Sequence, residues 1–266
     1  MSIALTMASR RSIEGVARTL RFGHARGMTS PLILADHHDA DALAAAYARH
    51  GRVQIGGFLA ADSARWLVQA LAASTGWKLT LNRGETILDY DRTAFAALPE
   101  GDRAAVSRMV AAGGRDGFQF CYDVIRAADA MPPDAPLPAA THLFNRPETL
   151  DRLRHITGAG DIARADAHAT RFGPGQFLTT HDDHIAGKGR RAAYVLNLTS
   201  RWRPDWGGLL LFYDAQGNVT RGFTPAFNTL TLFAVPQAHG VSWVTPLAAG
   251  PRHAITGWLL ADEAAG

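Results

Sequence analysis

The chain has 266 residues, of which 47% are hydrophobic and 19% charged, and its formal net charge is +3. This length allows one large domain or two small ones, and the composition is that of a globular protein rather than a disordered chain. No apolar run approaches the ~18 residues of a membrane span, and the arginines are spread without a dense cluster. We therefore expect neither a membrane anchor nor a nucleic-acid-binding face.

The first 27 residues differ from the rest of the chain in charge. They contain five arginines against a single acid, Glu14, and Met28 follows them. A basic, acid-poor leader is typical of a targeting peptide, but this one lacks the apolar segment of a secretory signal. We expect residues 1–27 to be a disordered extension or to precede the real start, and we assign a single domain to residues 28–266.

Helix signals dominate the segment that follows. Residues 41–49 are Ala-rich and predict a helix, and residues 53–58 predict a short strand. Asp62 or Ser63 is the expected N-cap of the next helix. Its apolar residues recur at helical spacing, which predicts one buried face: Ala64, Leu67, Val68 and Leu71.

Residues 78–158 complete the helix-rich half. The pattern predicts, in chain order, strands at 78–81 and 86–90, a helix at 103–112, a segment with one apolar side at 118–128 and an extended, proline-rich loop at 131–138. Gly113 and Gly114 are expected to end the helix before them. A further helix begins at Pro147, because proline is favoured at the first helical position, and ends at Thr157 with Gly158 as C-cap.

After about residue 165 the pattern changes to short β-type segments separated by Gly, Pro, Asn and Asp. The candidate strands are 177–181, 192–198, 208–213, 229–235, 241–244 and 253–260. Six or more short strands at this spacing predict a sandwich or jelly roll. We expect a mainly β fold with flanking α-helices, in which helical support from about 28–164 packs outside a jelly-roll core from about 165–262.

The counts of cysteine and histidine restrict any metal site. Cys121 is the only cysteine, so the chain forms neither an internal disulfide nor a cysteine-built zinc site, whereas there are eleven histidines. A bound metal would therefore be held by His, Asp or Glu. The single cysteine also favours a reducing compartment, and we expect a cytoplasmic protein.

A His-x-Asp pattern near residue 181 is the first candidate for such a site. Residues two apart on a strand share a face, so His181 and Asp183 are expected to point together into the barrel. His239, just after the predicted strand 229–235, supplies a second imidazole. Two histidines and one carboxylate on one side of a metal form the arrangement that non-haem Fe(II) oxygenases use.

The pattern is weak on its own, because His37 and Asp39 also fit it. That earlier copy precedes the Ala-rich helix, so we interpret it as a helix-capping segment. The alternative for the pair at 181 and 183 is a charged surface turn.

Arg252 adds a candidate anion-binding group. Strand alternation places Arg252, Thr256 and Trp258 on one face and His253 on the other, which excludes His253 as a metal ligand. A buried guanidinium needs an anionic partner, and a carboxylate accepts its paired hydrogen bonds. A structural ion pair with one of the chain's own acids stays open as the alternative.

These motifs together resemble a known family. The chain contains Phe172-Gly-Pro-Gly, His181-x-Asp183, Gly207-Gly208 before an apolar strand, His239-Gly-Val-Ser and Arg252 followed by Ala-Ile-Thr-Gly-Trp. The series over about residues 165–260 resembles the Fe(II)- and 2-oxoglutarate-dependent dioxygenases. Within them it is most similar to the prolyl 4-hydroxylase branch, closest to the ribosomal prolyl hydroxylase type and its bacterial relatives.

The resemblance implies a double-stranded β-helix, a cupin-like jelly roll, with N-terminal helices. It implies that His181, Asp183 and His239 hold Fe(II) and that Arg252 binds the distal carboxylate of 2-oxoglutarate, with Thr256 as a helper. It further implies O2 as a reactant and admits ascorbate as an additional cofactor. We interpret most of the other residues near the proposed site as surface or scaffold residues, and among them Arg190 and Trp206 are the candidates for substrate contact.

One departure from the family pattern concerns the strand after His-x-Asp. Many prolyl hydroxylases of this type have a tyrosine there that reaches 2-oxoglutarate, and this chain has Asn197, whose amide is shorter but still forms hydrogen bonds. The favoured function is prolyl hydroxylation of a protein or peptide. Hydroxylation of a free amino acid or secondary metabolite, and a non-catalytic jelly-roll binding module, remain as alternatives, and the sequence carries no signal of oligomeric state.

Overall fold

An antiparallel sheet folded into two facing layers forms the centre of the molecule. The computed structural model describes residues 32–127 and 131–262, and the predicted extension at 1–27 lies outside them. The larger layer has the spatial order β1 (Arg52–Gly56), β11 (Thr229–Ala234), β8 (Arg190–Asn197), β13 (Arg252–Ala261), β6 (His168–Phe172) and β4 (Phe120–Arg126). The smaller layer has the order β7 (Phe177–His181), β12 (His239–Val241), β9 (Leu210–Tyr213) and β10 (Val219–Phe223).

Three further strands extend the larger layer. β2 (Lys78–Arg83) pairs with β4 and with β3 (Thr86–Asp91), and β5 (Ile162–Ala165) pairs with β13. The two layers are joined where Phe120 and Cys121 of β4 pair with β7. This arrangement confirms the predicted mainly β jelly-roll core with flanking helices.

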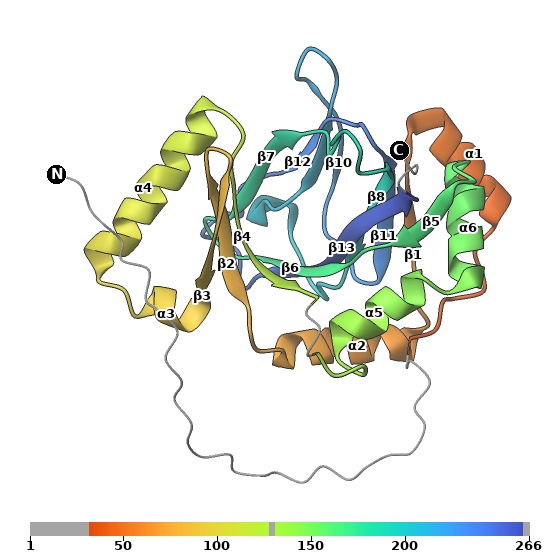
Figure 1. Cartoon of the computed structure of the whole chain (residues 1–266), viewed down its shortest axis with the longest axis horizontal. Coiled ribbons are helices and arrows are strands. Elements are labelled where there is room, and N and C mark those ends of the chain that lie inside the picture. Colours follow the sequence, from red (N-terminus) through yellow and green to blue (C-terminus); the bar gives the residue numbers. More distant parts are fainter. Residues whose placement is uncertain (1–31, 128–130, 263–266) are drawn as a thin grey trace, which may run out of the picture.

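Four helices cover the outer face of the larger layer (Figure 1): α1 (Ala40–His50), α2 (Ala61–Ala73), α5 (Pro136–Phe144) and α6 (Pro147–Thr157). Leu71 of α2 and Leu153 of α6 belong to one buried cluster with Leu196, Leu230 and Ile255 from the outer side of the strands. Because these helices cover the outer face, the other face of the larger layer is directed towards the smaller layer.

No helix in the described ranges combines the length and apolar character needed to cross a membrane.

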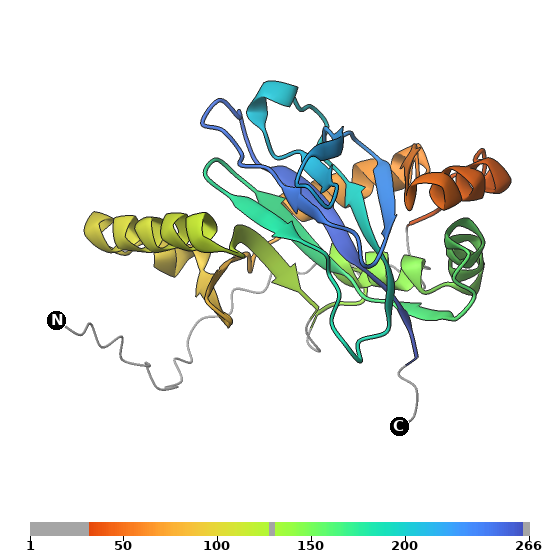
Figure 2. The same cartoon turned by 90° about the horizontal axis from the view of Figure 1, so that it is seen from above.

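The remaining helices lie at the opposite end of the molecule. α3 (Arg92–Ala96) and α4 (Glu100–Asp116) pack beside β2 and β3, away from α1 and α6, as Figure 2 shows from above. A 3-10 turn, η1 (Pro204–Trp206), precedes β9.

The space between the layers is filled from both sides. Val195 of β8 and Phe233 of β11 pack against Leu210 and Phe212 of β9 in one buried cluster. Because residues alternate along each strand, the inner-facing positions of the larger layer all look towards the smaller one. Polar side chains at those positions therefore meet inside the jelly roll rather than at its surface.

Several predicted elements agree with the structure, and α6 agrees to the residue. It spans Pro147–Thr157, and Gly158 caps it with a φ of 70°, a conformation that glycine adopts without steric cost. The interpretation of Asp39 as a cap is also confirmed, since its side chain accepts hydrogen bonds from the backbone N–H groups of Asp41 and Ala42.

The predicted cap of α2 was wrong. The helix begins at Ala61 with Ala60 as N-cap, so Asp62 and Ser63 both lie inside it. Ser63 is buried, and its hydroxyl accepts a hydrogen bond from the backbone N–H of Ile33. The Ser63 hydroxyl therefore binds the segment around Ile33 and does not cap the helix.

The proline-rich segment 131–138 was also only partly an extended loop. α5 begins at Pro136, because a proline in the first helical turn lacks an N–H that would have no partner there. The pattern also failed to predict the strands β5, β6 and β10. The residues of β10 are almost all exposed, so the strand shows no apolar alternation.

Gly113 and Gly114 do not end α4, which continues to Asp116. An added Cβ at Gly113 would collide with Oε1 of Gln119, a buried side chain whose amide donates to Asn82 Oδ1 at 2.8 Å. The glycine is therefore needed for close packing of the helix on the start of β4.

We expect Gly113→Ala to lower the free energy of unfolding by about 1–3 kcal/mol, because the extra methyl overpacks a filled site. Gly101→Ala in the same helix is the matched control, since an added Cβ there has no neighbour within 4 Å. The control should be neutral or stabilising by up to ~1 kcal/mol. Urea denaturation of both variants measures the difference, and equal effects would contradict the packing role of Gly113.

Candidate metal centre

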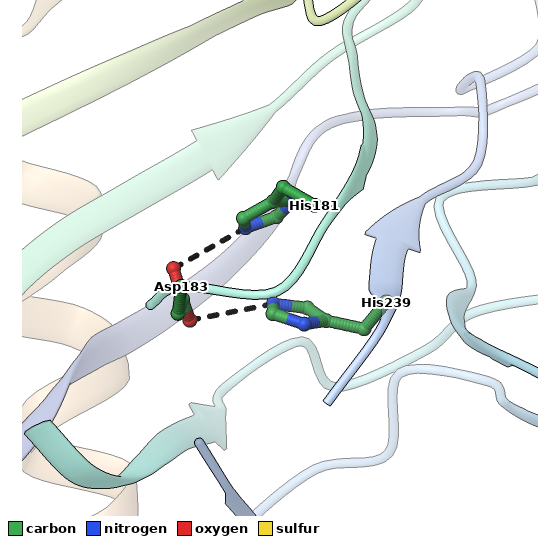
Figure 3. A group of neighbouring side chains, drawn as sticks. All are labelled: His181, Asp183 and His239. Carbon is green, nitrogen blue, oxygen red and sulfur yellow. Dashed lines mark ion pairs between the residues drawn. The ribbon is translucent and has the colours of Figure 1, made fainter. Parts of the chain in front are cut away.

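Two histidines and an aspartate converge between the layers (Figure 3). His181 is the last residue of β7 and pairs directly with His239, the first residue of β12. Nε2 of His181 lies 3.3 Å from Oδ1 of Asp183, and Nε2 of His239 lies 3.5 Å from Oδ2 of the same carboxylate. One ligand atom from each residue lies within 4.8 Å of the others. The structure thus brings the three predicted ligands together.

The reason for their convergence differs from the predicted one. β7 ends at His181, and Asp183 lies beyond it with a φ of 65°, in the left-handed region. Strand alternation therefore does not orient Asp183. A turn swings the carboxylate back towards the histidines, and the Arg190 guanidinium donates from Nη1 to the Asp183 carbonyl oxygen at 2.9 Å. Aspartate tolerates the left-handed conformation better than most residues.

Backbone carbonyls fix the orientation of both imidazoles. Nδ1 of His181 lies 3.0 Å from the Thr179 oxygen, and Nδ1 of His239 lies 2.7 Å from the Gln237 oxygen. A carbonyl oxygen only accepts hydrogen bonds, so each Nδ1 carries a proton and Nε2 is the ring nitrogen that faces Asp183. This is the orientation of histidines that bind metals through Nε2.

The electrostatics of the cluster favour a metal-binding protonation state. Burial, together with the neighbouring His181, lowers the pKa of His239 to about 4, so this imidazole is neutral near pH 7. Burial by itself would raise the pKa of Asp183, but the hydrogen bond with His181 and the attraction of His239 outweigh it and leave the pKa below its ordinary value. A neutral imidazole and an ionised carboxylate are the forms that coordinate metals.

This donor set fits Fe(II). Two imidazole nitrogens and one carboxylate are the ligands of a facial triad, which leaves other coordination positions open for reactants. A structural zinc site, in contrast, usually has four protein ligands, often thiolates. Among the described residues the cluster contains only His181, Asp183 and His239.

Arg252 is buried in the same interior, with 2% of its surface exposed. Nη1 donates to the Gly208 carbonyl oxygen at 2.7 Å and Nη2 donates to Oδ1 of Asn197 at 3.2 Å, while Nε is buried without a partner. No carboxylate of the described chain lies within 4.0 Å of it. Burial lowers its pKa to about 10, so the group is still charged at neutral pH.

Since no carboxylate lies within 4.0 Å, the alternative of an ion pair between Arg252 and one of the chain's own acids is not present in the described residues. A buried cation without such a partner is costly unless a bound anion compensates it. Asn197, only 3% exposed, serves Arg252 as a neutral hydrogen-bond acceptor.

The other residues predicted on β13 lie as alternation requires. Thr256 pairs with Val195 on one side and His168 on the other, between Arg252 and Trp258 on the inner face. His253 lies on the outer side, where its ring meets Trp77 at 5.9 Å between centroids. Its predicted exclusion from the metal cluster is consistent with this position.

Tyr122 is an inner-face residue that the sequence interpretation missed. Its ring stacks on that of Phe172 with 4.8 Å between centroids. The Arg252 guanidinium lies 5.4 Å from the centroid of the same Phe172 ring. Burial raises the pKa of Tyr122 to about 12, so its hydroxyl stays protonated and can donate a hydrogen bond. The aromatic residues Phe118, Phe120 and Tyr122 alternate along the chain, and that spacing was the available signal.

Trp206 is the other candidate for substrate contact. It packs edge-on against Trp202 at 5.3 Å and lines a pocket of about 500 Å³ together with His253. None of the three triad residues lines that pocket. Arg190, in contrast, contacts Asp183 directly.

Comparisons with known proteins agree with this geometry. Residues 167–260 match the model of the 2OG-Fe(II) oxygenase superfamily, a span that contains the triad and Arg252. This match confirms the resemblance predicted from the sequence. A search of curated proteins finds no matching relative.

Solved structures show the same fold at low sequence identity. A prolyl-4-hydroxylase from Pseudomonas putida has a TM-score of 0.53 and 20% identity, covering 84% of this chain and 99% of its own. A prolyl hydroxylase from Trichoplax adhaerens, in complex with a hypoxia inducible factor oxygen degradation domain peptide fragment, has a TM-score of 0.58 and 16% identity, covering 84% and 89%. The non-heme alpha ketoglutarate dependent epimerase SnoN from nogalamycin biosynthesis has a TM-score of 0.52 and 12% identity, covering 82% and 81%.

Proposed function

From the match of residues 167–260 to the 2OG-Fe(II) oxygenase superfamily, we propose that the protein is an Fe(II)- and 2-oxoglutarate-dependent dioxygenase that hydroxylates proline in a protein or peptide. The observation that carries the chemistry is the buried Arg252, which has no carboxylate partner in the described chain and shares the interior with the His-Asp-His cluster. A non-catalytic binding module would need neither this buried cation nor three metal ligands in the same interior.

In this proposal His181, Asp183 and His239 hold Fe(II), and Arg252 binds the distal carboxylate of 2-oxoglutarate. When bound, Fe(II) and 2-oxoglutarate supply the reductive activation of O2, with release of succinate and CO2 and transfer of oxygen to a C–H bond. The protein contributes binding, orientation and exclusion of side reactions.

The chain's own groups make these contributions in distinct ways. The carbonyls of Thr179 and Gln237 orient the two imidazoles so that each Nε2 points towards Asp183. Gly208 and Asn197 hold the Arg252 fork in place before an anion arrives, so little ordering is needed on binding. Thr256 is proposed to add a hydroxyl hydrogen bond, and the aromatic rings of Tyr122 and Phe172 keep the surroundings dry, which strengthens each ionic contact.

Asn197→Asp tests whether Arg252 must lack an internal counter-ion. The substitution keeps the side-chain shape but places a carboxylate where Oδ1 now lies 3.2 Å from Nη2. Because the new charge competes with the co-substrate, we expect the Kd for 2-oxoglutarate to rise about tenfold or more, equivalent to ~1.4 kcal/mol. Equilibrium dialysis of labelled 2-oxoglutarate against the Mn(II)-loaded protein measures it. Asn218→Asp, in an exposed turn, is the control, and equal affinities of the two variants would contradict this role of Arg252.

The proposed substrate class has support from the fold neighbours. Two of them are prolyl hydroxylases, and one of these was solved with a bound peptide fragment. The epimerase SnoN has a similar fold, which keeps a small-molecule substrate as the second candidate. A cytoplasmic location and a role for ascorbate stay predictions.

Mass spectrometry separates the two candidates. The protein, Fe(II), 2-oxoglutarate and O2 are incubated with proline-containing peptides in one arm and with free proline and other amino acids in the other. We expect a gain of one oxygen atom on a prolyl residue of a peptide. Oxygen gain confined to free small molecules would reject the peptide substrate.

A further inference from the structure

Arg190 is a cation beside the candidate metal centre, and no carboxylate of the described residues lies within 4.0 Å of it. Besides its hydrogen bond to the Asp183 carbonyl, its guanidinium lies 3.6 Å from the centroid of the Trp258 ring. The group is half-buried, and burial lowers its pKa from the ordinary value. Stacking on an aromatic face leaves the edge of a guanidinium free to donate hydrogen bonds.

Arg52 occupies a comparable position on β1. Its guanidinium lies 4.8 Å from the centroid of the Phe212 ring, and Phe212 pairs in register with His239. Burial and the neighbouring Arg221 lower the pKa of Arg52. Its hydrogen bonds go to neutral groups, the His50 carbonyl oxygen at 3.3 Å and the Thr220 hydroxyl at 3.4 Å.

The strand register places both groups at one level of the inner face. Arg52 pairs with Phe233, Phe233 pairs with Ala193, and Ala193 pairs with Trp258, on which Arg190 stacks. Three strand spacings of about 4.8 Å separate β1 from β13, a span of roughly 14 Å. An extended peptide covers that distance in about four residues.

Some other arginines of the described chain are paired with acids. Arg126 lies 2.7 Å from Asp89, and Arg191, the immediate neighbour of Arg190, lies 2.7 Å from Asp161. Within the described ranges no carboxylate comes within 4.0 Å of Arg52 or Arg190. Asp166 is the other acid that influences Arg190, but its carboxylate accepts the Trp258 backbone N–H at 2.6 Å.

Neither arginine is needed to balance the charges of the proposed metal and co-substrate site. Fe(II), the Asp183 carboxylate, the two carboxylates of 2-oxoglutarate and the Arg252 guanidinium together are neutral. Arg52 and Arg190 therefore remain as additional positive charges beside the candidate metal centre.

We propose that Arg52 and Arg190 select an acidic peptide, in which carboxylate side chains about four residues apart flank the residue to be hydroxylated. This inference rests on the proposed function. Each guanidinium offers paired N–H donors to one carboxylate, and the combined positive field attracts an acidic segment over longer distances. A basic peptide of the kind found in nucleic-acid-binding proteins is disfavoured by the same charges.

Binding of matched peptides to the wild-type protein tests the proposal. The probes are fluorescein-labelled peptides with the core Asp-Ala-Pro-Ala-Asp, the same core with Asn at both ends, and the same core with Lys. Fluorescence anisotropy with the Mn(II)-loaded protein should give about tenfold tighter binding for the Asp peptide than for the Asn peptide, and a preference that weakens as salt rises. Equal affinity of the Asp and Asn peptides, or tighter binding of the Lys peptide, overturns the proposal.

Turnover separates this inference from the proposed function. Succinate formation without any peptide reports on the oxygenase itself. If succinate forms but the Asp peptide stimulates it no more than the Asn peptide, only the acidic-substrate inference fails. Hydroxylation of free N-acetyl-aspartyl-proline without hydroxylation of the Asp peptide also overturns it.

Variants assign the preference to the two arginines. Arg52→Gln and Arg190→Gln should each raise KM for the Asp peptide several-fold and bring it towards that for the Asn peptide, whereas Arg191→Gln, at the exposed and acid-paired neighbour, should keep the wild-type preference. Peptides with a single Asp at one end or the other then show which arginine binds which of the two carboxylates. A preference that survives in both Gln variants would contradict the assignment.

Discussion

Replacing Asp183 with Asn is expected to weaken binding of Fe(II) by more than about 100-fold, because loss of even an outer hydrogen-bond partner of a ligand costs about 10–100-fold in metal affinity. The substitution keeps the shape of the side chain but removes the charge that faces both Nε2 atoms, at 3.3 and 3.5 Å. Calorimetric titration with Fe(II) under anaerobic conditions, or with Mn(II) in air, measures the affinity.

Asp182→Asn is the matched control for this variant. Asp182 is adjacent and exposed, and its carboxylate accepts a hydrogen bond from the backbone N–H of His184 rather than facing the histidines. We expect its metal affinity to equal that of the wild type. Unchanged affinity in Asp183→Asn, or the same loss in both variants, would show that the metal lies elsewhere.

Replacing Arg252 with Gln should have the second large effect, a rise of at least about 10–100-fold in the Kd for 2-oxoglutarate. One hydrogen bond to a charged group is worth about 1.5–3 kcal/mol, and each ~1.4 kcal/mol changes Kd tenfold. The fork is already positioned by Gly208 and Asn197, so the wild type loses little of this energy to ordering. Dialysis of labelled 2-oxoglutarate against the Mn(II)-loaded protein gives the Kd directly.

Two further variants interpret that result. Arg252→Lys keeps the charge but loses the paired geometry, so we expect an intermediate Kd. Arg203→Gln removes an exposed arginine that is paired with Asp205 and should leave the Kd unchanged. Circular dichroism confirms that each variant is folded. A folded Arg252→Gln protein with wild-type affinity for 2-oxoglutarate would refute the role of Arg252.

The sequence predicted the site better than it predicted the local geometry that forms it. His181, Asp183, His239 and Arg252 are brought into one interior as expected, because strand pairing and the motif spacing both point there. The alternation argument for Asp183 was wrong, since a turn with a left-handed residue orients it. Periodicity describes regular strands and carries no information about a turn that follows one.

The errors in the fold have a similar origin. Gly113 was expected to end a helix, yet it lies inside α4 because Gln119 packs closely against it, a contact between elements that no local pattern reports. β10 was missed because both of its faces are largely exposed. The sequence pattern does not place Arg52 near the site, since the register that brings β1 beside β11 is a property of the folded sheet.

Succinate formation is the measurement that tests the central claim most directly. The metal-free protein is given Fe(II), 2-oxoglutarate and O2, with and without proline-containing peptides, and succinate is quantified alongside Asp183→Asn and Arg252→Gln. We predict that the wild type converts 2-oxoglutarate to succinate only when Fe(II) and O2 are both supplied, and that both variants are inactive at the same concentrations. A wild type that forms no succinate under any of these conditions, or variants that match its rate, would contradict the account.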